Sequence, residues 1–116
     1  MITDTSYITW IGGLPRLKLP YRQSIQNRAF TYNSTVKHTC TIQIAKYNPS
    51  IKEIKNAESL YEQSLIKAYI LETFYKEKCI ELFWQDDWKR KVYDAYLNVA
   101  FTNIVFNILK EKIPVN

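Results

Sequence analysis

The sequence predicts an α+β fold in a single domain, residues 1–116, in which a basic, β-rich segment (residues 1–49) precedes a long two-helix hairpin (residues 50–113). Three observations predict it. Both glycines and three of the four prolines fall within the first 49 residues, and residues 50–113 contain neither. Apolar residues alternate with polar ones in the first part, and they recur at helical spacing in the second. At 116 residues the chain is long enough for one modest core and too short for two.

Short strand patterns separated by turn residues open the chain. The stretch SYITWI (residues 6–11) is typical of a strand, and Gly12-Gly13 indicates a turn. The stretch PRLKLPY (residues 15–21) alternates apolar and basic residues but is bracketed by prolines, which confine it to an edge strand or an extended arm.

A second strand pattern follows in VKHTCTIQI, residues 36–44, where apolar and polar positions alternate without a break. We expect a half-buried strand there. The preceding AFTY, residues 29–32, is the predicted hairpin partner, because Asn33-Ser34 between the two stretches suits a tight turn.

The first long helix is predicted over residues 51–83. Its start is marked by a capping box, in which Ser50 binds the amide of Glu53 and Glu53 reaches back to Ser50. Apolar residues at helical spacing form one main stripe. Further apolar residues lie off this stripe: Ile66, Ile70, Phe74 and Trp84.

The acidic stretch WQDDW, residues 84–88, predicts a turn in which Asp86 or Asp87 caps a second helix over residues 88–112. One uninterrupted helix is the alternative to this hairpin. The basic run at residues 89–91 would then lie in the first turn, where positive charge opposes the helix dipole. Either the second helix begins earlier, or the basic run faces an external partner.

The second helix carries AYLNVAFTNIVFNIL, residues 95–109, fifteen residues without a charged side chain. This length falls short of the roughly 20 residues that span a bilayer, so no membrane span is predicted. The stretch is apolar on two sides, and a small sheet covers only one. We therefore predict that the second face contacts another protein chain; the alternative is that the chain's own sheet covers it. The predicted interface residues are Leu97, Phe101, Ile104 and Ile108.

The net charge of +5 comes from the first half of the chain, where residues 1–50 contain six basic residues and one acidic residue. Several of the basic residues alternate with aromatic ones, a mixture that suits phosphate neutralisation and base stacking. A solvated sheet edge protected by lysines is the plainer alternative. The residues predicted to contact nucleic acid or another polyanion are Arg16, Lys18, Arg22 and Arg28.

Recognisable catalytic and metal-binding patterns do not emerge from the sequence. His38 and Cys40 are predicted to share the apolar face of one strand, which is a poor start for a catalytic dyad. Asp86 and Asp87 are explained by helix capping, since no further oxygen ligands follow at loop spacing. Cys40 and Cys79 are expected to stay reduced. We therefore expect a protein that is not an enzyme and that binds no metal or other cofactor.

The N-terminus lacks the charged and apolar regions of a signal peptide, so a cytoplasmic protein, in a host cytoplasm or an assembled particle, is expected. The leading functional hypothesis is a small assembly or structural protein of the virion or ribonucleoprotein type. It would form a homo-oligomer or bind a partner protein, and its basic segment would contact a neighbour or nucleic acid. The alternative is a small phage-type inhibitor or adaptor that binds a host nucleic-acid-processing enzyme.

Overall fold

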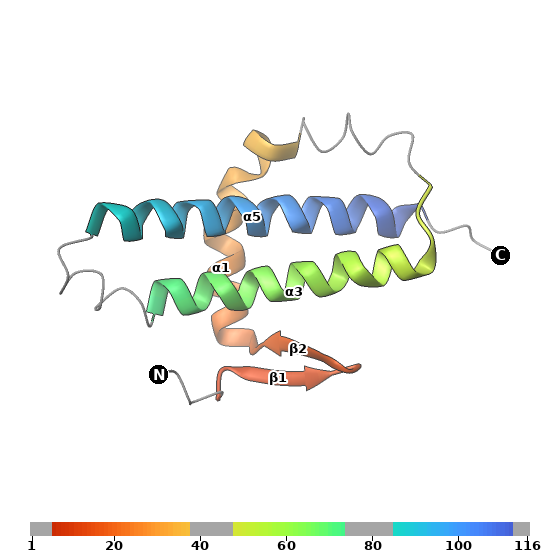
Figure 1. Cartoon of the computed structure of the whole chain (residues 1–116), viewed down its shortest axis with the longest axis horizontal. Coiled ribbons are helices and arrows are strands. Elements are labelled where there is room, and N and C mark those ends of the chain that lie inside the picture. The colour runs from red at the N-terminus through yellow and green to blue at the C-terminus, as the bar shows by residue number, and fades with distance from the viewer. Residues whose placement is uncertain (1–5, 38–47, 74–84, 113–116) are drawn as a thin grey trace.

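The fold is mostly helical, with a short antiparallel hairpin at the N-terminal end (Figure 1). A computed structural model describes residues 6–37, 48–73 and 85–112, with side chains of residues 85–87 excepted. The elements, in chain order, are β1 (Ile8–Ile11), β2 (Leu14–Leu17), α1 (Leu19–Ala29), the 3-10 helix η1 (Phe30–Tyr32), α3 (Ile51–Thr73) and α5 (Gln85–Glu111). The predicted excess of helix over strand is confirmed for this part of the chain.

The hairpin turns at Gly12 and Gly13, as predicted. Both residues have positive φ angles, 63° and 79°, which L side chains rarely adopt. This two-residue turn places Ile11 opposite Leu14, so β1 and β2 pair antiparallel along all four residues. The stretch SYITWI therefore contributes a strand, as expected, and the stretch at residues 15–21 contributes the end of β2 and the start of α1.

The predicted strand pair at residues 29–44 is wrong over the part that the structure describes. Residue 29 ends α1, residues 30–32 form η1, and residues 33–37 are helical; residues 38–44 lie outside the described residues. Pro20 in the first turn of α1 favours a helix start. Ile25 and Ala29, four residues apart, are both buried on one face of α1. This tertiary burial outweighs the strand preference of the aromatic and β-branched residues that follow.

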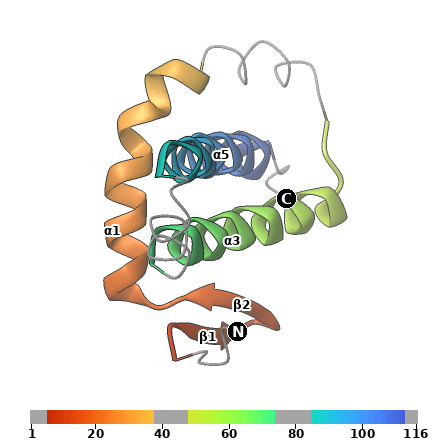
Figure 2. The same ribbon diagram turned by 60° about the vertical axis from the view of Figure 1, so that its left-hand side comes forward.

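Helices α3 and α5 run antiparallel and side by side (Figures 1 and 2). The capping box is present: the Glu53 amide donates to Ser50 Oγ (3.2 Å), and the Ser50 amide donates to Glu53 Oε1 (3.3 Å). A helical hairpin is thus confirmed over the uninterrupted helix, although residues 74–83 of the predicted first helix lie outside the described residues. Because α5 begins at Gln85, the basic run at residues 89–91 falls in its second turn.

The molecule is built in layers. The β-hairpin lies against α3, α5 lies on the other side of α3, and α1 crosses both long helices at one side (Figure 2). Leu17, Ile25, Leu65 and Val99 meet in the core, where each is almost fully buried. Close helix approach is possible because alanines occupy several of the buried positions.

Candidate protein-binding surface

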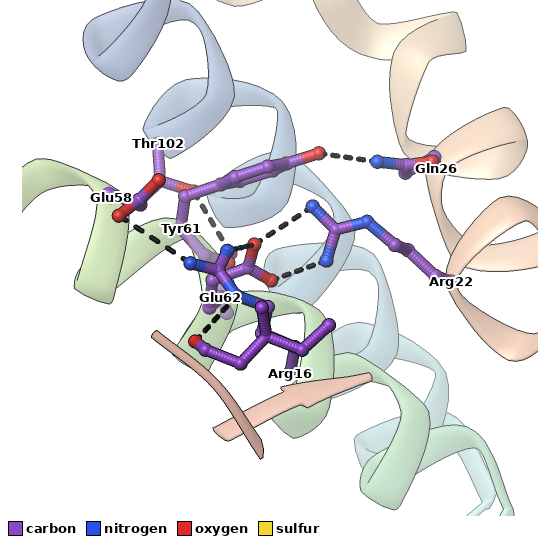
Figure 3. Close-up of polar contacts among 9 residues, drawn as sticks. Arg16, Arg22, Gln26, Glu58, Tyr61, Glu62 and Thr102 are labelled. Atoms are coloured by element: carbon purple, nitrogen blue, oxygen red, sulfur yellow. Dashed lines mark hydrogen bonds and ion pairs between the residues drawn. The ribbon is translucent and has the colours of Figure 1, made fainter. Parts of the chain in front are cut away.

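Glu62 lies buried at the centre of a polar cluster that joins β2, α1 and α3 (Figure 3). Its side chain is 2% exposed, and both carboxylate oxygens accept hydrogen bonds from arginines. Arg16 Nη1 lies 2.7 Å from Glu62 Oε1, and Arg22 Nη2 lies 2.9 Å from the same oxygen, while Arg22 Nη1 donates to Oε2. Arg16 Nη2 also lies 3.6 Å from Glu58. Two cations therefore compensate one buried carboxylate.

Tyr61 extends this cluster toward α1. Its hydroxyl accepts a hydrogen bond from Gln26 Nε2 at 2.8 Å, and its ring lies under the Arg22 guanidinium, with 5.6 Å between that group and the ring centroid. Burial raises the pKa of Tyr61 above its ordinary value, although Gln26 and Arg22 oppose the shift. Burial lowers the pKa of Arg22, but the hydrogen bond and charge of Glu62 outweigh it, so the net pKa is raised. Arg22 is consequently a fixed cation.

A second polar cluster joins α1, α3 and α5. Arg28 forms an ion pair with Glu72, and Arg28 Nη1 donates to the Tyr96 hydroxyl at 3.3 Å. The Tyr96 hydroxyl in turn donates to Glu72 Oε2. Burial raises the pKa of Tyr96, and the nearby Arg28 charge lowers it by less. Each long helix is thus tied to α1 by a polar contact.

These contacts engage three of the four residues predicted to contact a polyanion. Arg16, Arg22 and Arg28 face carboxylates of α3, and Lys18 has an exposed side chain. The excess of positive charge in residues 1–50 is therefore partly balanced in the folded chain, because the arginines of this segment lie against acidic residues of α3. Polyanion binding by these residues stays a prediction.

The predicted interface face of α5 is partly covered by the chain itself. Ile104 is 9% exposed, Leu97 and Ile108 are half-buried, and Phe101 is 40% exposed. Ile104 and Ile108 line a pocket of about 440 Å³ together with Asn33 and Lys37. Helical residues 33–37, rather than a sheet, thus lie beside this face. The contact with another chain stays a prediction, with Phe101 as its exposed member.

A larger apolar groove, with a volume of about 620 Å³, lies between the β-hairpin and α3. The hairpin supplies Ile8, Trp10 and Pro15, which share one face because Trp10 pairs with Pro15 and side chains alternate along a strand. Helix α3 supplies the remaining residues: Gln63, Ile66, Lys67, Ile70 and Leu71. Lys67 is the one charged residue in this lining.

Trp10 is the prominent exposed residue beside this groove, and Ile11, the next residue of β1, is exposed on the other face of the strand. Their exposed fractions are 71% and 58%, high values for large apolar side chains. The groove and the Trp10 side chain together form one apolar surface, which we call the hairpin surface. It is the candidate protein-binding site of the chain.

Sequence reasoning did not predict the hairpin surface as a site, although it noted two of its residues on α3. Ile66 and Ile70 were noticeable as apolar residues off the main stripe of their helix. Trp10 was assigned to a strand without a functional role, because alternation alone leaves open which strand face is covered. The exposure of Trp10 depends on α3, which lies more than 40 residues further along the chain.

Other kinds of site are not evident in the part of the chain that the structure describes. Residues 6–37, 48–73 and 85–112 contain no cluster of three or more histidine, cysteine, aspartate or glutamate side chains suited to a metal ion. Within the same ranges, no helix has the length and apolar character needed to cross a membrane. His38, Cys40 and Cys79 lie outside them. No protein-family model, curated protein or solved structure matches this chain.

Proposed function

We propose that this chain is a small, non-enzymatic assembly protein that associates with further copies of itself. The hairpin surface carries this proposal. A tryptophan that is 71% exposed beside an apolar groove of about 620 Å³ is a costly arrangement for a chain that stays alone in water.

The expected gain from covering this surface is appreciable relative to the stability of a small domain. Burying a large apolar side chain is worth about 1.5–3 kcal/mol, and Trp10 offers a gain of this size before the costs of association. Domains of this kind are stable by only about 5–15 kcal/mol. A contact at the hairpin surface therefore has enough driving force to matter.

The charge distribution favours a protein contact over a nucleic-acid contact at the N-terminal segment. Arg16 and Arg22 already neutralise Glu62, and separating them would leave that carboxylate buried without a partner. Lys18 remains exposed and available to a neighbouring chain or a nucleic acid. We therefore place the primary contact on the apolar surface and assign the basic residues a secondary part.

The test is the mass of the purified protein by sedimentation velocity over a wide concentration range. We expect wild type to associate as its concentration rises, and Trp10→Ser to remain a monomer with unchanged helix content. Phe101→Ser is the matched control, since Phe101 is also an exposed aromatic residue but lies on α5.

Two other results would change the proposal. Loss of association in Phe101→Ser but not in Trp10→Ser would move the contact to the α5 face. A wild-type protein that is monomeric at every concentration would overturn self-association and favour the alternative, an inhibitor or adaptor that binds a different protein.

A further inference from the structure

We propose that β1 of one copy pairs antiparallel with β1 of a second copy, around a two-fold axis at Thr9, to form a four-stranded sheet. This inference rests on the proposed self-association and specifies how it takes place. In the described part of the chain, β1 pairs with β2 alone, and β2 lies between β1 and α3 (Figure 1). Among the described residues, none pairs with the outer side of β1, which is a sheet edge there.

The hydrogen bonds of the hairpin show which main-chain groups face that edge. The Lys18 amide donates to the Tyr7 carbonyl at 2.9 Å, so residues 7 and 18 form a hydrogen-bonded pair. Such pairs alternate along an antiparallel ladder, which makes Thr9–Arg16 the next one and Ile11–Leu14 the last. The amide and carbonyl groups of Ile8 and Trp10 therefore point outward from β1.

The same alternation makes the two edges of the hairpin unequal. On β2 the outward main-chain groups belong to Pro15 and Leu17, and Pro15 has no amide hydrogen to donate. Proline and charged side chains are common protections of sheet edges. Residues Ile8–Ile11 of β1 include neither, so β1 is the edge that remains suited to strand addition.

The outward groups of β1 are complementary to themselves. In an antiparallel pair centred on Thr9, Ile8 of each copy lies opposite Trp10 of the other copy. The main-chain amide and carbonyl groups of Ile8 and Trp10 point outward in both copies, so they can form hydrogen bonds across the new pair. The two side chains also share a strand face, so Trp10 of each copy packs against Ile8 of the second copy, beside the groove. One register thus satisfies the hydrogen bonds and covers the exposed tryptophan.

The absence of charge on β1 also fits a second copy. Each chain carries a net charge of +5, but β1 has no charged side chain, so two edges meet without like charges opposing each other. The area is modest, because a four-residue edge and one tryptophan bury less than the roughly 800 Å² per partner of a standard interface. The expected dimer is therefore weak and depends on protein concentration.

Disulfide trapping tests the register directly. In a Cys40→Ser, Cys79→Ser background, Thr9→Cys places two thiols in a non-hydrogen-bonded pair, where the Cα atoms are about 4.5 Å apart and a disulfide fits. Ile11→Cys is the matched control. In this register, residue 11 of one copy lies opposite residue 7 of the other copy, four residues away from position 11 of that copy. The two Cα atoms at position 11 are therefore about 13 Å apart, which is too far for a disulfide.

Under mild oxidation we expect a covalent dimer from Thr9→Cys and little from Ile11→Cys, although Ile11 is the more exposed residue. Equal trapping of the two variants, or preferential trapping of Ile11→Cys, would overturn the register. Sedimentation of the reduced proteins separates the two proposals. If they associate but the trapping pattern is absent, the edge pairing fails and self-association stands; if they stay monomeric, both fail. Binding of an unrelated extended peptide without self-association would assign the edge to a different protein.

Discussion

Glu62 is the residue on which the N-terminal half of the fold depends. A carboxylate that is 2% exposed is stable in the interior only when it is well compensated, and here it accepts hydrogen bonds from Arg16 and Arg22. These two arginines tie β2 and α1 to α3, and their side chains are partly open to water. Loss of the carboxylate would leave two cations facing each other.

We expect Glu62→Gln to lower the free energy of unfolding by about 2 kcal/mol, because the arginines lose their counter-charge while remaining partly hydrated. Urea unfolding measures this loss. The control is Glu58→Gln, whose pair with Arg16 is longer (3.6 Å) and more exposed, and which should cost less than about 1 kcal/mol. Equal losses of unfolding free energy in the two variants would show that the buried carboxylate of Glu62 stabilises the fold no more than the more exposed carboxylate of Glu58.

The buried tyrosines predict how stability depends on alkaline pH. Burial raises the pKa of Tyr61 and of Tyr96 above their ordinary value of 10.0 in the folded chain. The folded state therefore holds these protons more tightly than the unfolded state, so their contribution is fully present below pH 10 and is lost as the pH rises through the folded-state pKa.

We accordingly expect the melting temperature to fall as the pH rises above about 10, and to fall less steeply in Tyr61→Phe and Tyr96→Phe. Thermal melts of all three proteins across that range measure the difference. If the melting temperatures of wild type and both variants fall in parallel with pH, groups other than these tyrosines cause the loss of stability at alkaline pH.

At the scale of the element, the hairpin turn depends on backbone conformation alone. A Cβ atom built on Gly12 or Gly13 would meet no other atom within 4 Å, so any cost of substitution comes from the positive φ angles. We expect Gly12→Val to lower the free energy of unfolding by about 1–2 kcal/mol. Gly12→Asn should be nearly neutral, since asparagine tolerates this conformation and Asn-Gly is a favoured hairpin turn. Chemical denaturation of both variants checks the contrast, and similar losses would point to a steric cause instead.

The start of α3 depends on the reciprocal bonds between Ser50 and Glu53. We expect Ser50→Ala to cost about 1 kcal/mol, because the Glu53 amide loses its acceptor at the first helical turn. Ser59→Ala, inside the same helix, should cost less, since no helix-end amide depends on Ser59. Denaturant midpoints of the two variants make the comparison, and a larger loss in Ser59→Ala would remove the capping box as an explanation.

At the scale of the whole molecule, local signals predicted the elements better than they predicted the surfaces. The capping box at Ser50 and the turn at Gly12-Gly13 depend on neighbouring residues, and both appear as expected. Residues 29–32 and the first residues of 36–44 were predicted to be strands but are helical where the structure describes them, because the burial of Ile25 and Ala29 against distant elements decides their state. The carboxylates that pair with Arg16 lie on α3, and so do several residues of the groove beside Trp10, and composition carries no information about such arrangements.

The separation of Arg22 from Glu62, 40 residues along the chain, has a consequence for synthesis on the ribosome. At about 5–20 residues per second, roughly 2–8 s pass between the translation of the two residues. A two-stranded hairpin alone is marginally stable in water, although it forms within about 10 μs. We therefore expect the nascent β-hairpin to fold and unfold repeatedly, with its arginines hydrated, and to become persistent only after Glu62 has been translated.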